Sequence, residues 1–252
     1  MPRTLKTEAI VLRSIRYGEA DRVLHLYTKE RGKVGAIAKG SRRPRSRFGG
    51  RLEPFFRLEL LLYEGRGELL TVTSATTVAG HPRLRESAAS LTVAARACDS
   101  VLRLFDSVEP NLAAYNLLSG YLALLDVTTG ADAAPRAEAR DPSEPASRAT
   151  ALSFRLKLAL AAGFVPELAA CAQCSEAEDI VGFSGSAGGV VCGACEGGGF
   201  PLTAHAHAFM VEALGRPLSE TPRAGEKTLD QVERAVTETV EHHAHVRLRE
   251  AA

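Results

Sequence analysis

The chain has 252 residues, of which 45% are apolar and 24% charged, so a packed core is available and global disorder is excluded. No stretch approaches the roughly 18–20 uninterrupted apolar residues of a membrane helix, and the N-terminus has no apolar signal region; both favour a cytoplasmic protein with reduced cysteines. Residues 1–80 contain 16 Lys and Arg against 8 Asp and Glu, whereas the remainder contains 15 against 22. The net charge of +8 over the first third indicates an anionic partner for that part.

Residues 1–80 are predicted to form a small β-barrel. Short runs rich in β-branched and aromatic residues alternate with glycine-containing turns, and we expect strands near residues 7–16, 22–28, 33–39, 53–63 and 68–78. Five short strands at near-regular spacing fit a closed barrel, and the five-stranded oligonucleotide-binding (OB) barrel is the commonest arrangement of this kind. Strand spacing alone does not distinguish it from an SH3-like barrel.

A run of basic residues separates the third and fourth predicted strands. Its cations are Lys39, Arg42, Arg43, Arg45, Arg47 and Arg51. Glycine and proline in the same segment indicate a loop, and arginine both binds phosphate bidentately and stacks on bases. We therefore predict a DNA contact here, with a solvated surface loop as the alternative. Nearby Phe48, Phe55 and Phe56 are candidate stacking platforms, although core packing is the simpler role for each.

After residue 81 the apolar spacing becomes helical. We expect helices over residues 83–105, 112–127, 148–162, 204–215 and 227–248. The proline-containing run 130–147 is predicted to be a surface loop or linker. The sequence thus predicts an α+β multidomain protein, with a barrel over residues 1–80 and a helical domain over residues 81–252.

Two Cys-x-x-Cys pairs lie between the third and fourth predicted helices. Cys171 and Cys174 are separated by seventeen residues from Cys192 and Cys195, and a hairpin through residues 180–191 would bring the pairs together. Four thiolates at this spacing are typical of a zinc ribbon, here at about residues 168–200. Four cysteines fill the tetrahedral shell, so we expect one structural Zn²⁺; two disulfides or free thiols are the alternatives.

No sequence pattern favours catalysis. The chain contains neither a phosphate-binding Gly-x-x-x-x-Gly-Lys-Ser/Thr loop nor a Gly-x-Gly-x-x-Gly turn after a strand. The His-x-Glu element of zinc deaminases is absent, and the Gly182–Ser186 segment lacks the last glycine of a nucleophile elbow. We therefore expect no enzymatic activity.

Several motifs resemble the RecO family of bacterial DNA repair proteins. They include Glu8-Ala-Ile-Val-Leu-Arg, Tyr17-Gly-Glu-Ala-Asp-Arg and Ala38-Lys-Gly-Ser-Arg-Arg near the start, then Phe154-Arg-Leu-Lys-Leu-Ala-Leu-Ala-Ala-Gly-Phe-Val-Pro and the two cysteine pairs. They occur in the same order over most of the chain. The resemblance implies an OB barrel, a helical domain and a four-cysteine zinc module.

The resemblance also implies a function. RecO-like proteins bind single- and double-stranded DNA, anneal complementary strands and act with RecR to load RecA onto strands coated by single-strand binding protein (SSB). For the acidic SSB tail we expect a basic and apolar groove in the helical domain, with Arg155 and Lys157 as its cations. The alternatives are a zinc-ribbon protein of transcription or ribosome assembly, and an uncharacterised zinc-dependent enzyme.

Overall fold

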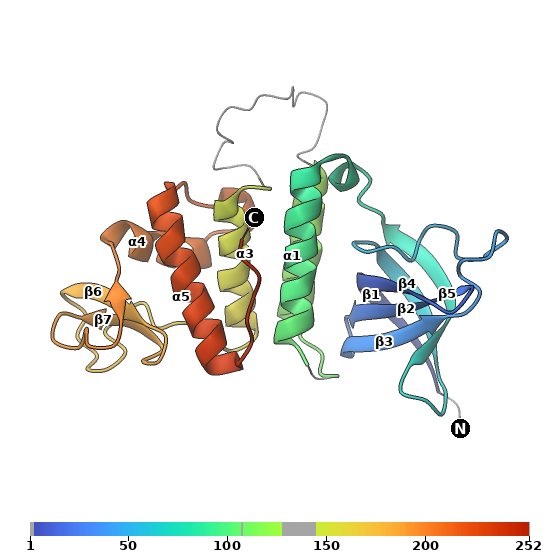
Figure 1. Ribbon diagram of the computed structural model, residues 1–252, viewed down its shortest axis with the longest axis horizontal. Helices are drawn as coiled ribbons and strands as arrows, with labels where there is room; N and C mark the ends of the chain where they lie inside the picture. Colours follow the sequence, from blue (N-terminus) through green and yellow to red (C-terminus); the bar gives the residue numbers. More distant parts are fainter. Residues whose placement is uncertain (1–2, 107, 128–144, 252) are drawn as a thin grey trace.

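Figure 1 shows the computed structural model, which describes residues 3–106, 108–127 and 145–251. The first part is a closed barrel of five strands: β1 (Arg3–Tyr17), β2 (Asp21–Thr28), β3 (Gly32–Ala38), β4 (Arg57–Glu64) and β5 (Leu70–Ala79). Their order around the barrel is β1-β2-β3-β5-β4, and only the β3–β5 pair is parallel. The predicted OB-type barrel is confirmed, and this strand order excludes the SH3-like alternative.

The fourth strand begins later than predicted. Residues 53–56 form turns before β4, because Phe55 adopts a left-handed backbone with φ of 74°. The Phe55 amide still donates to the Val11 carbonyl at 2.9 Å, and the Val11 amide donates to Phe56 at 2.9 Å. The segment is therefore hydrogen-bonded to β1 but is not part of β4.

Three helices follow the barrel. A short 3₁₀ turn, η1 (Arg83–Glu86), precedes α1 (Ala88–Leu104), and α2 (Leu112–Val127) and α3 (Arg148–Ala161) come next. The helix predicted over residues 83–105 is divided at Ser87, whose extended backbone and side-chain bond from the Ser90 amide begin α1 anew. The linker predicted over residues 130–147 lies outside the described residues up to position 144.

The rest of the chain joins a small sheet to two helices. Strands β6 (Ile180–Ser184), β7 (Gly189–Cys192) and β8 (Phe200–Pro201) form the sheet, in the order β7-β6-β8, and the predicted hairpin is confirmed. Then come α4 (Ala204–Gly215), the 3₁₀ turn η2 (Leu218–Glu220) and α5 (Glu226–Ala244). No helix among the described residues is long and apolar enough to cross a membrane.

The last helix is shorter than predicted. It ends at Ala244 rather than at residue 248, because His245 takes a left-handed conformation with φ of 54°. The chain then turns back between α5 and α1 (Figure 1). The prediction failed because Val246 and Leu248 continue an apolar spacing that in the structure belongs to an extended segment.

Helices α1 and α2 pack against the barrel. Tyr27 of β2 meets Phe105 edge-to-face, with ring centroids 5.5 Å apart. The Tyr115 hydroxyl donates to the Glu8 carboxylate at 2.8 Å, and the Lys33 ammonium donates to the Leu102 carbonyl at 3.0 Å. These contacts fix the barrel relative to the first two helices.

Candidate nucleic-acid interface and metal centre

The cationic loop, residues 39–51, is folded onto the end of the barrel. Phe48 is 1% exposed and packs in the barrel core together with Leu52. The Gly40 amide donates to the Asp21 carboxylate at 2.7 Å, and the Arg42 amide donates to the Ala20 carbonyl at 2.8 Å. These anchors hold the loop against the β1–β2 turn.

The cations of this loop face solvent. Those concerned are Lys39, Arg42, Arg43, Arg45, Arg47 and Arg51, all of which are exposed. Arg51 and Arg42 donate to main-chain carbonyls, and Arg47 lies 4.9 Å from the centroid of the Phe48 ring. Over the described residues, no carboxylate lies within ion-pair distance of any of the six. The loop therefore presents uncompensated positive charge.

The aromatic residues near the loop are mostly structural. Phe48 and Phe55 are buried, so their rings are not available for stacking, and Phe56 is half-buried against the barrel core. Tyr17 and Tyr63 are 58% and 38% exposed. Exposed rings thus lie on the strands and not in the cationic loop.

A second group of basic side chains on the barrel was not predicted from the sequence, although its Lys33 is already paired with Asp106 at 2.8 Å. Arg13 of β1 lies opposite His25 of β2, and Lys33 of β3 lies opposite Tyr27 of β2. Burial, followed by the charges of Arg13 and Lys33, lowers the pKa of His25. Alternation along each strand indicates which side chains face outward, but only the strand register brings these three together.

The four cysteines converge at the edge of the small sheet. Each offers a sulfur, and these atoms all lie within 4.8 Å of one another; Cys174 and Cys192 are separated by 3.6 Å. A tetrahedron with Zn–S distances of about 2.3 Å has edges of about 3.8 Å, so the cluster has the size of a metal shell. The four cysteines are therefore close enough to bind a metal ion.

Backbone turns shape this cluster. The Ser175 amide donates to the Cys171 carbonyl at 2.8 Å, and the Cys195 amide donates to the Cys192 carbonyl at 3.0 Å. Amides of Cys192 and Cys174 point at the Cys171 sulfur and hold its pKa down at about 6, which favours the thiolate. The Cys174 thiol raises the pKa of Cys195 to about 12. Four sulfurs this close can all ionise only when a cation lies between them, and the residues fit such a cation.

The two candidate partner-binding cations have different positions on α3. Arg155 is 4% exposed and makes an ion pair with Glu233 of α5 at 3.1 Å, so it does not share a groove with Lys157 as predicted. Lys157 donates to the Leu214 carbonyl at 2.9 Å and borders a mostly apolar cleft of about 460 Å³ between α2 and η2. Of the pair, only Lys157 borders this cleft.

The fold and these two sites define a protein built from an OB barrel with an exposed cationic loop and a helical body with a four-cysteine ribbon. The family model described as Recombination protein O N terminal matches residues 1–81, and that described as Recombination protein O C terminal matches residues 141–251. The chain belongs to the RecO family of DNA repair proteins, in agreement with the resemblance seen in the sequence.

Relatives named DNA repair protein RecO match over most of the chain. That of Rubrobacter xylanophilus is 38% identical over 240 residues, covering 91% of this chain and 89% of the relative. That of Anaeromyxobacter dehalogenans is 35% identical over 258 residues, covering 97% and 93%. That of Bifidobacterium animalis subsp. lactis is 38% identical over 189 residues, covering 74% and 72%.

Proposed function

We propose that this protein is a recombination mediator that binds single- and double-stranded DNA and anneals complementary strands without catalytic chemistry. The supporting observation is the set of six exposed cations in the cationic loop, which have no carboxylate partner in the part of the chain that the structure describes. Annealing joins two polyanions, so their repulsion must be offset. In this proposal residues 1–80 are the DNA-binding domain and residues 81–252 the partner-binding domain.

The proposed partners are RecR, SSB and, functionally, RecA, because family membership supports the same mediator role. For the acidic SSB tail we propose the cleft beside α2, where apolar side chains such as Leu117 and Leu218 adjoin the ammonium of Lys157. Arg155 is excluded from this surface by its burial.

The metal in this proposal is one structural Zn²⁺ held by Cys171, Cys174, Cys192 and Cys195. Zinc in such a shell has no position for water or substrate and contributes to folding alone. The closed ribbon and the separate basic barrel both support a division of labour: the ion shapes the second domain, and the first domain binds DNA.

The DNA-binding proposal is tested by salt titration. If six cations contact single-stranded DNA, the logarithm of affinity falls with the logarithm of salt concentration at a slope of about −0.7 × 6, roughly −4. Changing Arg42, Arg43, Arg45 and Arg47 to alanine leaves two of the six, so the slope falls to roughly −1.4 and strand annealing is lost.

Removing charge elsewhere provides the control. Three exposed cations lie far from the loop in sequence: Arg216 follows α4, Lys227 lies in α5 and Arg247 follows α5. Replacing all three by alanine should leave both the slope and strand annealing unchanged. Retained annealing in the fourfold loop variant would move the DNA site away from the cationic loop. A strong preference for RNA over single-stranded DNA would instead favour a transcription or ribosome-assembly role.

A further inference from the structure

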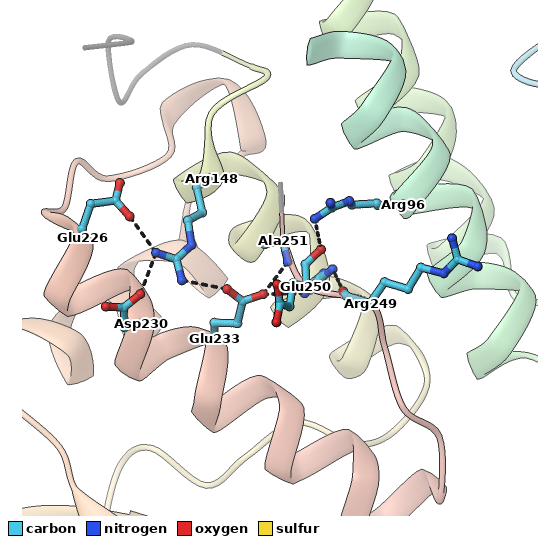
Figure 2. A network of polar contacts seen from close by, with 9 residues as sticks. Arg96, Arg148, Glu226, Asp230, Glu233, Arg249, Glu250 and Ala251 are labelled. Carbon is cyan, nitrogen blue, oxygen red and sulfur yellow. Dashed lines mark hydrogen bonds and ion pairs between the residues drawn. The ribbon is translucent and has the colours of Figure 1, made fainter. Parts of the chain in front are cut away.

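The residues after α5 form an extended segment with its own binding groove. Residues 246–251, here called the C-terminal strap, leave α5 at His245 and run between α1 on one side and α3 with α5 on the other (Figure 1). Figure 2 shows the end of the strap, where Arg249, Glu250 and Ala251 are surrounded by charged side chains from three helices.

The groove holds the strap through its main chain. Arg96 of α1 donates to the Glu250 carbonyl, and Arg155 of α3 donates to the Arg249 carbonyl. The Ala251 amide donates to the carboxylate of Glu233 on α5 (Figure 2). Guanidinium donors and a carboxylate acceptor aimed at peptide groups bind an extended chain whatever its side chains.

Strap side chains provide the remaining recognition, chiefly Leu248 and Ala251. Leu248 is 7% exposed and packs with Ala159 of α3 and Val240 of α5. Three residues later, Ala251 packs against both main helical core clusters. The intervening Glu250 is exposed, and Arg249 is exposed but lies 3.6 Å from the Asp99 carboxylate of α1. The apolar contacts of the groove therefore select one aliphatic and one small residue three positions apart.

The walls of the groove are held in place by contacts that do not involve the strap. Arg148 at the start of α3 is fixed by Glu226, Asp230 and Glu233 of α5, each at 2.6–2.7 Å (Figure 2). Arg155 pairs with the same Glu233. When the strap leaves, Glu233 remains compensated by two arginines, so α3 and α5 stay in register.

The strap is also accessible from outside. A cleft of about 540 Å³, bordered by Arg148, Glu233 and the strap residues Leu248 and Glu250, lies alongside it. One side of the strap is therefore open to solvent.

We infer that this groove is a peptide-binding site and that the C-terminal strap is its removable internal occupant. The ligand that it fits is an extended segment of a partner protein with an aliphatic residue three positions before a small one, bound through its peptide groups. The strap closes the site until such a segment displaces it. This inference is independent of the proposed DNA binding.

The test compares the full chain with a chain ending at Ala244. The probe is a fluorescent peptide with the sequence of residues 245–252, measured by anisotropy. We expect the shortened chain to bind it at least tenfold more tightly than the full chain does. The same peptide carrying Leu248→Asp should not bind. Equal binding by both chains, or binding by neither, would overturn the inference.

Full-length variants guard against a folding defect in the shortened chain. Leu248→Asp weakens the strap and leaves every groove residue intact, so it should also increase peptide binding. Arg247→Ala is the matched control, because that side chain is 89% exposed and pairs only with Glu241 at 3.5 Å among the described residues; it should bind as the parent does. Parent-like binding by the Leu248→Asp variant would reject an occluded site.

Discussion

At the scale of single residues, Arg155 and Lys157 show how position on a helix outweighs residue type. The two are separated by about 200° around the axis of α3, because successive residues turn by about 100°. Arg155 consequently faces α5 and its Glu233, whereas Lys157 reaches the cleft beside α2. The sequence places two cations on one helix. Only the packing of α5 on α3 decides which of them is buried in an ion pair.

A charge reversal at Lys157 tests the proposed site for the acidic SSB tail. We expect Lys157→Glu to weaken binding of an acidic tail peptide about tenfold, or about 1.4 kcal/mol, because an attraction becomes a repulsion. Calorimetric titration with the peptide measures the change. The control is Lys29→Glu, a reversal in the exposed β2–β3 turn of the barrel, which should bind as the parent does. Unchanged binding by Lys157→Glu would place the tail elsewhere.

At the scale of elements, the four-cysteine ribbon depends most on its proposed ion. Its strands are two to five residues long, and the sulfurs gather at one edge of the sheet. Zinc binding by small ribbons is worth roughly 10–16 kcal/mol, whereas whole domains are stable by about 5–15 kcal/mol. The sheet has a second source of stability, because Phe183, Val190 and Phe200 are buried in one core cluster with side chains of α3, α4 and α5. Loss of the ion should therefore affect the cysteine turns first.

Removing two ligands tests this dependence. We expect the double variant Cys171→Ser and Cys192→Ser to lose bound zinc and to melt at a clearly lower temperature than the parent. Metal analysis and thermal unfolding give the two readouts. Cys98→Ala is the control, because that buried thiol belongs to the α1 core and its loss should leave the zinc stoichiometry at one. Unchanged zinc content and melting in the double variant would contradict a structural ion.

Helix ends marked by local sequence signals were predictable. Helix ends that depend on contacts with residues far away in the sequence were not. The bounds of α2 and α4 agree with the prediction, since α4 has a Thr203 cap at its start and Gly215 at its end. The end of α5 was misplaced because Leu248 continues the helical spacing of apolar residues. In the structure Leu248 instead packs, from an extended segment, against Ala159 of α3 and Val240 of α5. The cysteine cluster followed from spacing alone.

At the scale of the whole molecule, the contact between barrel and helices joins residues far apart in sequence. Tyr115 reaches Glu8 across 107 positions, and Lys33 reaches the Leu102 carbonyl across 69. No local sequence pattern predicts this contact between the barrel and the helices. At Gly32 backbone approaches backbone, since a Cβ built on this glycine would lie 2.1 Å from the Glu109 carbonyl oxygen.

Gly32→Ala therefore measures how firmly the helical body is seated on the barrel. The position has φ of +59°, and we expect a loss of about 2–5 kcal/mol, from about 1–2 for a left-handed alanine and about 1–3 for overpacking. Gly18→Ala is the matched control: its φ is +53°, but nothing lies within 4 Å of its Cβ, so only the backbone cost applies. Urea unfolding of both variants gives the difference, and equal losses would mean that the α1–α2 connection moves aside freely.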